Sequence, residues 1–423
     1  MTQPRGAGNR ALAAWALYDW ANSAFPTTII SFVFAGYFAK AVAPDEVTGQ
    51  AWWSFGVGLS ALVVAILAPF CGAIADRDGR RKPWIAVFTI TCILATAALW
   101  TIRPDPALAI VALVLVGIAN IGFEMASVFY NAMLPSLAPP NRMGRWSGWA
   151  WGVGYAGGLS VLAISLVGFV QAESPWFGLA HEEAANVRAT SVLVAVWFAL
   201  FALPMFFLTP DDPATGIAPS AALRQGIGQL VKTFRQVRDY RDIAVFLLAR
   251  VFYIDGLTTL FVVGAIFAGT AFGLSFEEII LFGIAINVFS GIGAAAFGWV
   301  DDWWGPKPTI LLSIAGLTGL IIALLIIDTK FMFWVFGLPL GLFVGPIQAA
   351  SRTLMAELAP AHLRGEMFGL FAFSGKATAF AGPILLGAVT SITGSQRAGM
   401  AVIVAMLITG GLLLAAVRMP PKS

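Results

Sequence analysis

Residues 72–83 read GAIADRDGRRKP, a charged loop between two long apolar segments of the chain. The apolar segments cover residues 51–75 and 83–102, and each is long enough to cross a bilayer, which takes roughly 20 residues. A related loop, GWVDDWWGPKP, recurs at residues 298–308, where Gly, Asp, Gly, Lys and Pro keep their order. The two loops lie about 226 residues apart, so the chain is predicted to contain two similar membrane-spanning halves.

The composition excludes a soluble protein. Of the 423 residues, 59% are hydrophobic and only 11% are charged, and the mean hydropathy is +0.84. Soluble domains carry about 25% charged residues, and an outer-membrane barrel would show short alternating segments instead of long apolar runs. We therefore expect an all-α polytopic membrane protein that contacts lipids. The net charge of +3 arises mostly from basic residues in loops, so no nucleic-acid partner is expected.

Twelve apolar spans can be placed along the chain. They cover residues 11–39, 51–75, 83–102, 107–134, 146–170, 189–208, 241–271, 276–300, 308–327, 331–356, 366–392 and 398–417. Two further landmarks repeat in order: NAMLPSLAP at residues 131–139 matches RTLMAELAP at residues 352–360, and Tyr18-Asp19 matches Tyr253-Ile254-Asp255. The sequence therefore predicts two pseudo-symmetric six-helix bundles, residues 1–208 and 241–423. The linker of residues 209–240 forms either an amphipathic helix on the membrane surface or a simple tether.

Lysine and arginine indicate the orientation in the membrane. Of the 25 basic residues, three lie inside spans and five lie in loops on one side, namely Lys40, Arg103, Arg188, Lys330 and Arg397. Seventeen lie on the other side with both termini: Arg5, Arg10, Arg77, Arg80, Arg81, Lys82, Arg142, Arg145, Arg224, Lys232, Arg235, Arg238, Arg241, Lys307, Arg364, Arg418 and Lys422. Because loops rich in Lys and Arg stay in the cytoplasm, both termini are expected to be cytoplasmic, in a plasma (inner) membrane.

Six charged residues fall inside the spans. The acids Asp19, Glu124 and Asp255 balance the bases Arg250, Arg352 and Lys376, as expected if charges within a membrane must pair. Five polar residues accompany them: Tyr18 and Asn22 near Asp19, Asn131 seven residues after Glu124, Tyr253 near Asp255, and Gln348 four residues before Arg352. Spacings of four and seven place side chains on nearly the same face of a helix, so these groups are candidates for one polar site.

The loop of residues 72–83 has a physical rationale. Asp76 ends span two, where an acid can face the positive N-terminal end of a neighbouring helix. Gly79 permits a tight turn, and Arg77, Arg80 and Arg81 can pair with acids or lipid phosphates. Either these groups gate a conformational change, or they only fix the topology.

Residues 72–82 closely resemble the cytoplasmic signature of the major facilitator superfamily, Gly-x-x-x-Asp-Arg-x-Gly-Arg-Arg-Lys. The resemblance implies a twelve-helix transporter in which spans 1, 4, 7 and 10 line a central cavity. It also implies that the loop, with Gly72 and Asp76 at its start, is a latch that stabilises the outward-open state. The second loop keeps Asp302, but Trp303 and Trp304 replace Arg77 and Asp78, which speaks against an equal gating role for the two loops.

Three segments resemble one branch of this superfamily, the vacuole effluxers, which are the autophagy-linked amino-acid exporters and their bacterial relatives. They are WALYDWANSAF at residues 15–25, FYNAMLP at residues 129–135, and GPIQAASR at residues 345–352, the last followed by Phe368-Gly369 and Gly375-Lys376. Since the fungal members are associated with efflux from the vacuole, the resemblance implies amino-acid export.

Two interpretations of the intramembrane charges follow. In the first, Arg352 or Lys376 recognises an anionic group such as a carboxylate, while Asp19 and Asp255 bind an ammonium group or carry a coupling proton. In the second, the charges only form fixed interhelical pairs. Arg250 is the weakest candidate, because it lies on another helix face from Asp255 and can snorkel to the interface.

The predicted function is secondary active transport of a small polar or zwitterionic, amino-acid-like solute, by alternating access and with proton coupling. The alternative is an exporter or flippase of amphipathic drugs or lipids on the same fold. No enzyme activity and no cofactor are expected, since no paired catalytic motif, Walker loop or dinucleotide fingerprint occurs. No metal site is expected either, because His181 has no second His or Cys nearby in the sequence. We expect a monomer.

Overall fold

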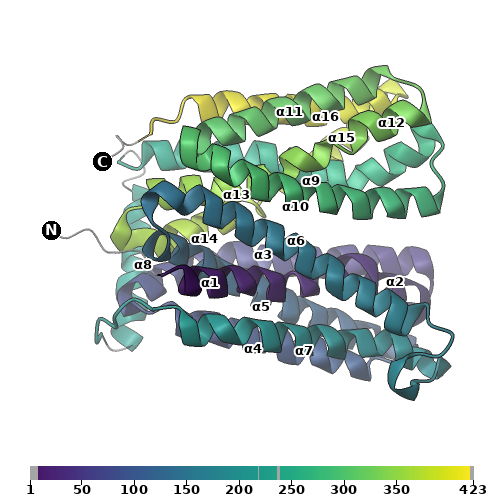
Figure 1. Cartoon of the computed structure of the whole chain (residues 1–423), viewed down its shortest axis with the longest axis horizontal. Helices are drawn as coiled ribbons and strands as arrows, with labels where there is room; N and C mark the ends of the chain where they lie inside the picture. Colours follow the sequence, from purple (N-terminus) through teal and green to yellow (C-terminus); the bar gives the residue numbers. More distant parts are fainter. Residues whose placement is uncertain (1–7, 218, 236–238, 420–423) are drawn as a thin grey trace.

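The computed structural model describes residues 8–217, 219–235 and 239–419, which form helices, turns and loops without a strand. Figure 1 shows two stacked groups of long helices, the first half in purple to teal and the second half in green to yellow. The first half holds α1 (Asn9–Asn22), α2 (Phe34–Tyr37), α3 (Glu46–Asp78), α4 (Lys82–Ala98), α5 (Ala109–Leu137), α6 (Met143–Ser165) and α7 (Ala185–Leu208). The second half holds α9 (Arg241–Phe272), α10 (Phe276–Trp304), α11 (Pro306–Ile326), α12 (Lys330–Gly337), α13 (Leu340–Leu358), α14 (Arg364–Ser374), α15 (Ala381–Thr393) and α16 (Gln396–Ala415).

Helix α1 begins and helix α16 ends at the same end of the molecule, which we call the terminal end (Figure 1). The last residues of α3, α5, α10 and α13 and the first residues of α6, α9 and α14 also lie there, because successive spans alternate in direction. Of the basic residues used to predict the orientation, Arg5, Arg238 and Lys422 lie outside the described residues.

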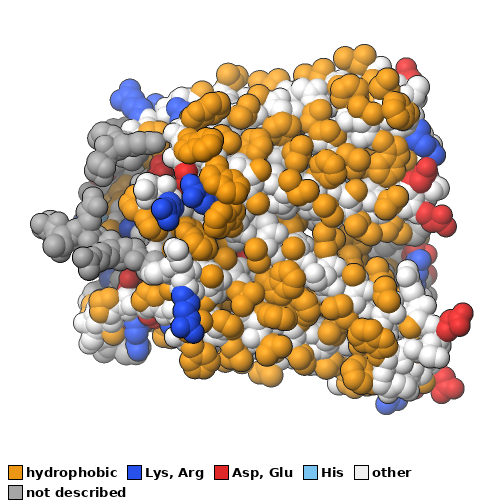
Figure 2. Space-filling view, in the orientation of Figure 1, with side chains coloured by type: hydrophobic (Ala, Val, Ile, Leu, Met, Phe, Trp, Pro, Cys, Tyr) orange, Lys and Arg blue, Asp and Glu red, His pale blue; other side chains and the backbone are white. Residues whose placement is uncertain are grey.

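The outer surface of the helices is apolar. Figure 2 shows hydrophobic side chains over the middle of the visible face, with many of the charged side chains near the two ends. Large apolar side chains such as Phe55, Phe207 and Ile384 are exposed, although soluble proteins rarely expose wide apolar surfaces. In the described part of the chain, 11 helical stretches are long and apolar enough to cross a membrane. The protein is therefore a multi-pass membrane protein.

The predicted span of residues 366–392 is not one continuous helix. Residues 375–380 form a turn that separates α14 from α15. Gly375 caps the end of α14, and Pro383 follows in the first turn of α15. Proline cannot donate a backbone hydrogen bond and clashes with the carbonyl four residues earlier in a continuous helix, which explains the break. The turn places Lys376 inside the protein rather than on a regular helix face.

The two halves meet at two crossings of small residues. At one, Gly148 of α6 lies so close to the carbonyl of Ala294 in α10 that a Cβ atom would clash. At the other, Gly72 of α3 lies directly against the carbonyl of Gly365 in α14. Small residues let helix backbones approach closely in a membrane. The crossings join spans two and eleven and spans five and eight, so the same contact occurs twice, as expected for pseudo-symmetric halves.

The segment between the halves contains helix α8 (Pro219–Arg235). Helix α8 packs against the terminal end of α3, since a Cβ atom on Gly226 would lie 2.9 Å from the Cα atom of Ile74. Leu230 and Thr233 are buried on the same helix, whereas Arg224 is exposed. Residues 219–235 of the linker therefore form a helix that packs against the protein, whereas the sequence left open an amphipathic helix on the membrane surface or a simple tether.

Candidate functional site

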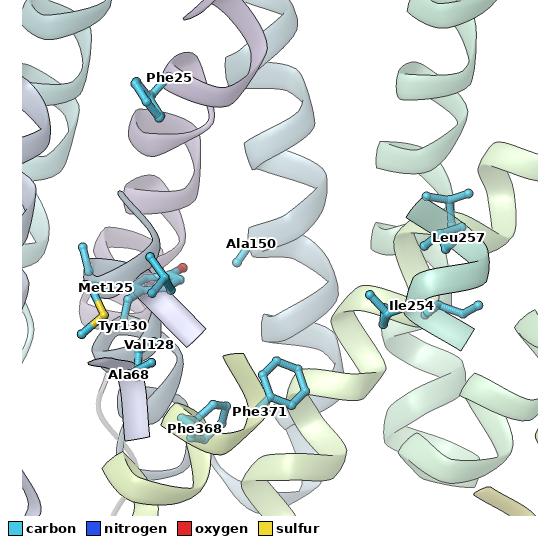
Figure 3. Packing of buried hydrophobic residues seen from close by; sticks show 14 of the residues in the cluster. Phe25, Ala68, Met125, Val128, Tyr130, Ala150, Ile254, Leu257, Phe368 and Phe371 are labelled. Carbon is cyan, nitrogen blue, oxygen red and sulfur yellow. The ribbon is translucent and has the colours of Figure 1, made fainter. Parts of the chain in front are cut away.

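A central cavity of about 390 Å³ lies between the two halves. It is lined by α1, α5 and α6 of the first half and by α9, α13 and α14 of the second. Its charged and amide side chains are Asp19, Asn22, Glu124, Asn131, Arg250, Gln348, Arg352 and Lys376. Figure 3 shows apolar members of the same wall, with Val128 and Tyr130 on α5 and Phe368 and Phe371 on α14. The volume lies within the range of small-molecule sites, roughly 300–1,000 Å³.

Two other hollows are larger but chemically less suited. One of about 510 Å³ lies between α3 and α5, and one of about 420 Å³ lies between α6 and α10. Apolar side chains dominate both hollows. The first includes Phe55 and Ile110, and the second includes Val288 and Ile292, all of which are exposed on the outer surface. Lipid chains fill such grooves in a membrane, so the central cavity is the candidate site because polar groups converge there.

The first ion pair in the cavity joins Asp19 to Arg352 across the two halves. The Nη1 atom of Arg352 lies 3.2 Å from Asp19 Oδ2 and 3.1 Å from Asn131 Oδ1. Its Nε donates to Ser147 Oγ at 2.9 Å, and its Nη2 donates to the Ser147 carbonyl at 2.7 Å. The guanidinium also lies 4.8 Å from the ring of Trp15. All three nitrogens of Arg352 are thus engaged, and its side chain is only 2% exposed.

The second ion pair joins Glu124 of α5 to Lys376 in the turn between α14 and α15. Lys376 Nζ lies 2.6 Å from Glu124 Oε1. The two side chains are 31% and 19% exposed, so this pair is more open to solvent in the cavity than the Asp19–Arg352 pair. Both pairs cross between the halves, so both must separate or rearrange if the halves move apart on this side.

Arg250 of α9 has no acid within 4 Å among the described residues. Its Nη1 donates to the carbonyl of Phe371 at 2.7 Å and to Ser374 Oγ at 2.9 Å. Its guanidinium carbon lies 3.6 Å from the centre of the Phe371 ring. Arg250 is buried and lines the cavity, so the expectation that it snorkels to the interface is wrong. The reason is tertiary: the broken helix α14 offers it a carbonyl and a hydroxyl inside the protein.

The first charged loop holds the terminal end together. Asp76 accepts hydrogen bonds from the backbone N–H groups of Gly365 and Glu366, each at 2.8 Å, at the start of α14. The positive end of α14 stabilises this carboxylate, which is the geometry that the sequence suggested. Arg81 also lies 3.8 Å from Asp76. Span two of the first half is thus bonded to span eleven of the second.

The second loop repeats this arrangement. Asp302 at the end of α10 accepts a hydrogen bond from the Arg145 backbone N–H at 3.0 Å, near the start of α6. The Arg145 side chain lies 3.1 Å from the same carboxylate. Although Trp303 and Trp304 replace the charges of the first loop, the aspartate caps the equivalent helix in the other half.

Gly79, Arg81 and Arg77 of the first loop contact the linker. Gly79 has φ +88°, where a side chain is strained, and it packs against Pro213. Arg81 pairs with Asp212, and its backbone N–H donates to Asp211. Arg77 donates to Gln229 of α8 at 2.8 Å. Arg80 is exposed and lies 3.5 Å from Asp78.

A family model described as "Vacuole effluxer Atg22 like" matches residues 7–146 and 141–422. The chain belongs to this Atg22-like family.

Relatives of known name support the assignment. The uncharacterized transporter YxiO of Bacillus subtilis, of the major facilitator superfamily type, is 26% identical over 405 residues, which cover 95% of this chain and 93% of YxiO. Autophagy-related protein 22 of Kluyveromyces lactis is 24% identical over 80% of this chain and 74% of its own length. The protein of the same name from Cryptococcus neoformans is 26% identical over 60% of this chain, but the match covers only 49% of that protein.

Solved structures of the major facilitator superfamily have the same fold. The proton:xylose symporter XylE superposes with a TM-score of 0.72, over 97% of this chain and 95% of that chain, at 14% identity. FucP in its outward conformation superposes with a TM-score of 0.72, over 97% of this chain and 99% of that chain, also at 14% identity. Such low identity shows the fold alone. Together with the family match, it makes this protein a transporter of the Atg22-like branch and not an enzyme.

Three predicted site residues of this Atg22-like protein lie outside the cavity wall. Tyr18 shares a hydrogen bond of 2.5 Å with Thr89 of α4, and Tyr253 shares one of 2.7 Å with Ser351 of α13. Asp255 is buried and accepts a hydrogen bond from the Gly382 backbone at 3.2 Å, at the start of α15. Neighbouring residues of a helix point about 100° apart, so Tyr18 points away from the cavity that Asp19 enters.

The sequence did not predict the residues around the Arg352 guanidinium in this Atg22-like protein, of which Tyr130 and Trp151 line the cavity itself. Ser147 and the rings of Trp15, Tyr130 and Trp151 surround the Arg352 guanidinium. Trp15 and Tyr130 are also stacked on one another, with ring centres 4.6 Å apart. Ser147 and Trp151 are four residues apart on α6, but no spacing rule links them to Trp15 of α1 or Tyr130 of α5. Only the aromatic richness of residues 15–25 hinted at a packed environment there.

Proposed function

We propose that this protein is a secondary active transporter of a small zwitterionic, amino-acid-like solute. Two cross-half pairs of opposite charge in a cavity of small-molecule size carry this proposal. A zwitterion can bind one acid with its ammonium group and one base with its carboxylate, and so can replace protein–protein contacts between the halves. The family model is described as a vacuole effluxer, and autophagy-related protein 22 of Kluyveromyces lactis is a relative, which supports transport of a solute across a membrane.

The arrangement of contacts supports alternating access. The hydrogen bonds made by Asp76, Asp302, Ser147 and Arg352 join the halves at the terminal end and at the depth of the cavity. By the excess of Lys and Arg on that side, the terminal end is cytoplasmic in the plasma membrane. The Asp76 and Asp302 contacts would then be latches that keep the cytoplasmic side closed, and Arg77, Arg80 and Arg81 would support the first latch.

Asp19 is the proposed site of the coupling proton. Its carboxylate is 15% exposed and is paired with Arg352, so protonation would release the arginine from one cross-half contact. A proton that enters the cavity would thus weaken the same contact that a bound ammonium group would weaken. We further expect the protein to work as a monomer in contact with lipids, since each chain holds a complete cavity.

Transport by purified protein in proteoliposomes tests the proposal. We expect an imposed pH gradient to drive accumulation of at least one amino acid, and we expect Asp19→Asn to abolish the effect of the gradient. The matched control is Tyr18→Phe, one residue away and outside the cavity, which should transport normally. Amino-acid transport that ignores the pH gradient would remove the coupling proposal, and no amino-acid transport would remove the substrate proposal.

A second candidate function is export of amphipathic molecules. The cavity wall also holds the rings of Phe123, Trp151, Phe368 and Phe371, which favour an apolar ligand. The same proteoliposomes distinguish the two functions. Movement of a hydrophobic dye or a labelled lipid, without movement of any amino acid, would favour the second candidate.

A further inference from the structure

We propose that Arg250 is the subsite that binds the carboxylate of the transported solute. This inference rests on the proposed function and assigns one end of the zwitterion to one place in the cavity. The sequence pointed instead to Arg352 or Lys376 for this task. The contacts that Arg250, Arg352 and Lys376 make in the cavity favour Arg250 for this role.

The described cavity wall contains one more basic side chain than acidic side chains. The acids are Asp19 and Glu124, and the bases are Arg250, Arg352 and Lys376. Asp19 is bonded to Arg352 and Glu124 to Lys376. Arg250 is 8% exposed and has no acid within 4 Å among the described residues. The Glu124 carboxylate acts on Arg250 electrostatically, but it is already bonded to Lys376, so Arg250 has no acid of its own in the described part of the chain. A buried cation without a directly paired acid is costly, so an anionic group is expected to join it during the transport cycle.

The hydrogen-bond donors of Arg250 are only partly used. Its Nη1 is held by the Phe371 carbonyl and Ser374 Oγ. Its Nε is buried and has no hydrogen-bond partner among the described residues. Arginine carries five N–H donors, and the edge formed by Nε and Nη2 is one that binds a carboxylate bidentately. By contrast, Nε, Nη1 and Nη2 of Arg352 all have protein partners.

The surroundings hold the Arg250 guanidinium in a fixed plane. The Phe371 ring covers one face at 3.6 Å, and Gly375 makes room for the group, since a Cβ atom there would lie 2.7 Å from Nη1. Lys376 follows directly in the same turn. A fixed guanidinium loses little side-chain entropy on binding, which favours recognition of a planar anion. The ammonium group of the solute would then face Asp19 or Glu124 in the first half.

Binding of matched ligands tests the assignment. The probes are free leucine, glutamate, lysine and tyrosine and the corresponding amino-acid amides, measured by thermal shift and by titration. We expect the wild-type protein to bind at least one free amino acid more than tenfold more tightly than its amide. Arg250→Gln should lose that difference by weakening the free acid alone, and Arg250→Lys should keep part of it.

Arg188→Gln is the matched control. Arg188 is also buried, bonded to carbonyl groups and placed over an aromatic ring, that of Trp100, but it lies outside the cavity. The Arg188→Gln protein should therefore still bind the free amino acid more tightly than its amide. If Arg250→Gln keeps that preference too, the carboxylate subsite is not at Arg250.

Acetate separates failure of this subsite from failure of the proposed substrate. If no amino acid or amide binds the wild-type protein, the amino-acid proposal falls, and acetate is titrated against the wild-type and Arg250→Gln proteins. A shift in Tm with acetate in the wild-type protein alone would support an anion subsite at Arg250. An equal response of the two proteins, or no response, would overturn it.

Discussion

At the scale of single residues, the two cross-half ion pairs differ in their surroundings. Arg352 is almost fully buried and makes four hydrogen bonds, whereas the Lys376 side chain is 31% exposed and donates a hydrogen bond to Glu124. Burial removes solvent screening, so the same kind of contact has unequal consequences for stability at the two places. This contrast yields two predictions.

We predict that Arg352→Gln lowers the free energy of unfolding by about 3 kcal/mol, because it leaves the Asp19 carboxylate without its counter-charge in a mostly buried place. Thermal unfolding in detergent measures the loss. The double variant with Asp19→Asn should be more stable than the single variant, since no uncompensated charge is left. If the stability lost in the double variant equals the sum of the losses in the two single variants, Asp19 and Arg352 do not stabilise each other.

We predict that Lys376→Gln costs about 1 kcal/mol or less, because water in the cavity screens this pair. Transport should nevertheless fall, since the pair joins the two halves, which the proposed transport cycle moves apart. Parallel measurements of Tm and of uptake on one preparation check both parts. A loss of stability as large as that of Arg352→Gln would contradict the difference in screening.

At the scale of helices, the crossings between the halves depend on the absence of side chains. Gly148 lies against Ala294 and Gly298 of α10, while Gly58 of α3 has nothing within 4 Å of a Cβ atom. We predict that Gly148→Ala destabilises the protein by about 1–3 kcal/mol through overpacking. Gly58→Ala, the matched control, should be neutral or stabilising, since alanine favours a helix by about 1 kcal/mol over glycine. Thermal unfolding of both variants measures the difference. Equal changes in stability for Gly148→Ala and Gly58→Ala would contradict the close contact between α6 and α10.

The break between α14 and α15 shows what the hydropathy pattern can predict and what it cannot. The apolar run of residues 366–392 predicted one spanning helix, whereas the structure divides it into α14, of 11 residues, and α15, of 13 residues. Neither helix is among the 11 stretches long enough to cross a membrane, and the pair Gly375-Lys376 lies at the break between them. Hydropathy does not report where backbone hydrogen bonds stop, however. The break requires Gly375, Pro383 and partners such as Arg250 that bind the exposed end of α14, and only the packed structure brings those partners together.

At the scale of the whole molecule, Asp76 and Asp302 occupy equivalent places in the two halves. Each caps the first turn of a helix in the other half, at the same end of the protein. The two contacts therefore oppose separation of the halves at that end. The linker adds to the first contact only, through Asp211, Asp212 and α8. The two aspartates thus make the same kind of helix-capping contact, but only the Asp76 contact is supported by the linker.

We predict that Asp76→Asn and Asp302→Asn each open the terminal end and reduce transport while the protein is still expressed. The measurement is labelling of a cysteine placed at Ala372 in the cavity wall, in a background without Cys71 and Cys92, with a thiol reagent applied from the cytoplasmic side. Labelling should rise in each single variant and rise further in the double variant. Unchanged labelling and transport would leave the aspartates with a purely structural role.

The sequence by itself determined the class of protein, the repeat of the two halves and the set of charges inside the apolar segments, and 11 of its twelve predicted spans are long apolar helical stretches in the described residues. These properties are local: apolar runs of sufficient length must cross a bilayer as helices, and an ordered loop motif can be read along the chain. Only the tertiary structure decided which charges meet. Asp19 and Arg352 are 333 residues apart, and Asp255, which resembled Asp19 in the repeat, turns toward α15 instead. A rotation of one residue on a helix moves a side chain by about 100°, so the partners of a buried charge depend on packing that no spacing rule contains.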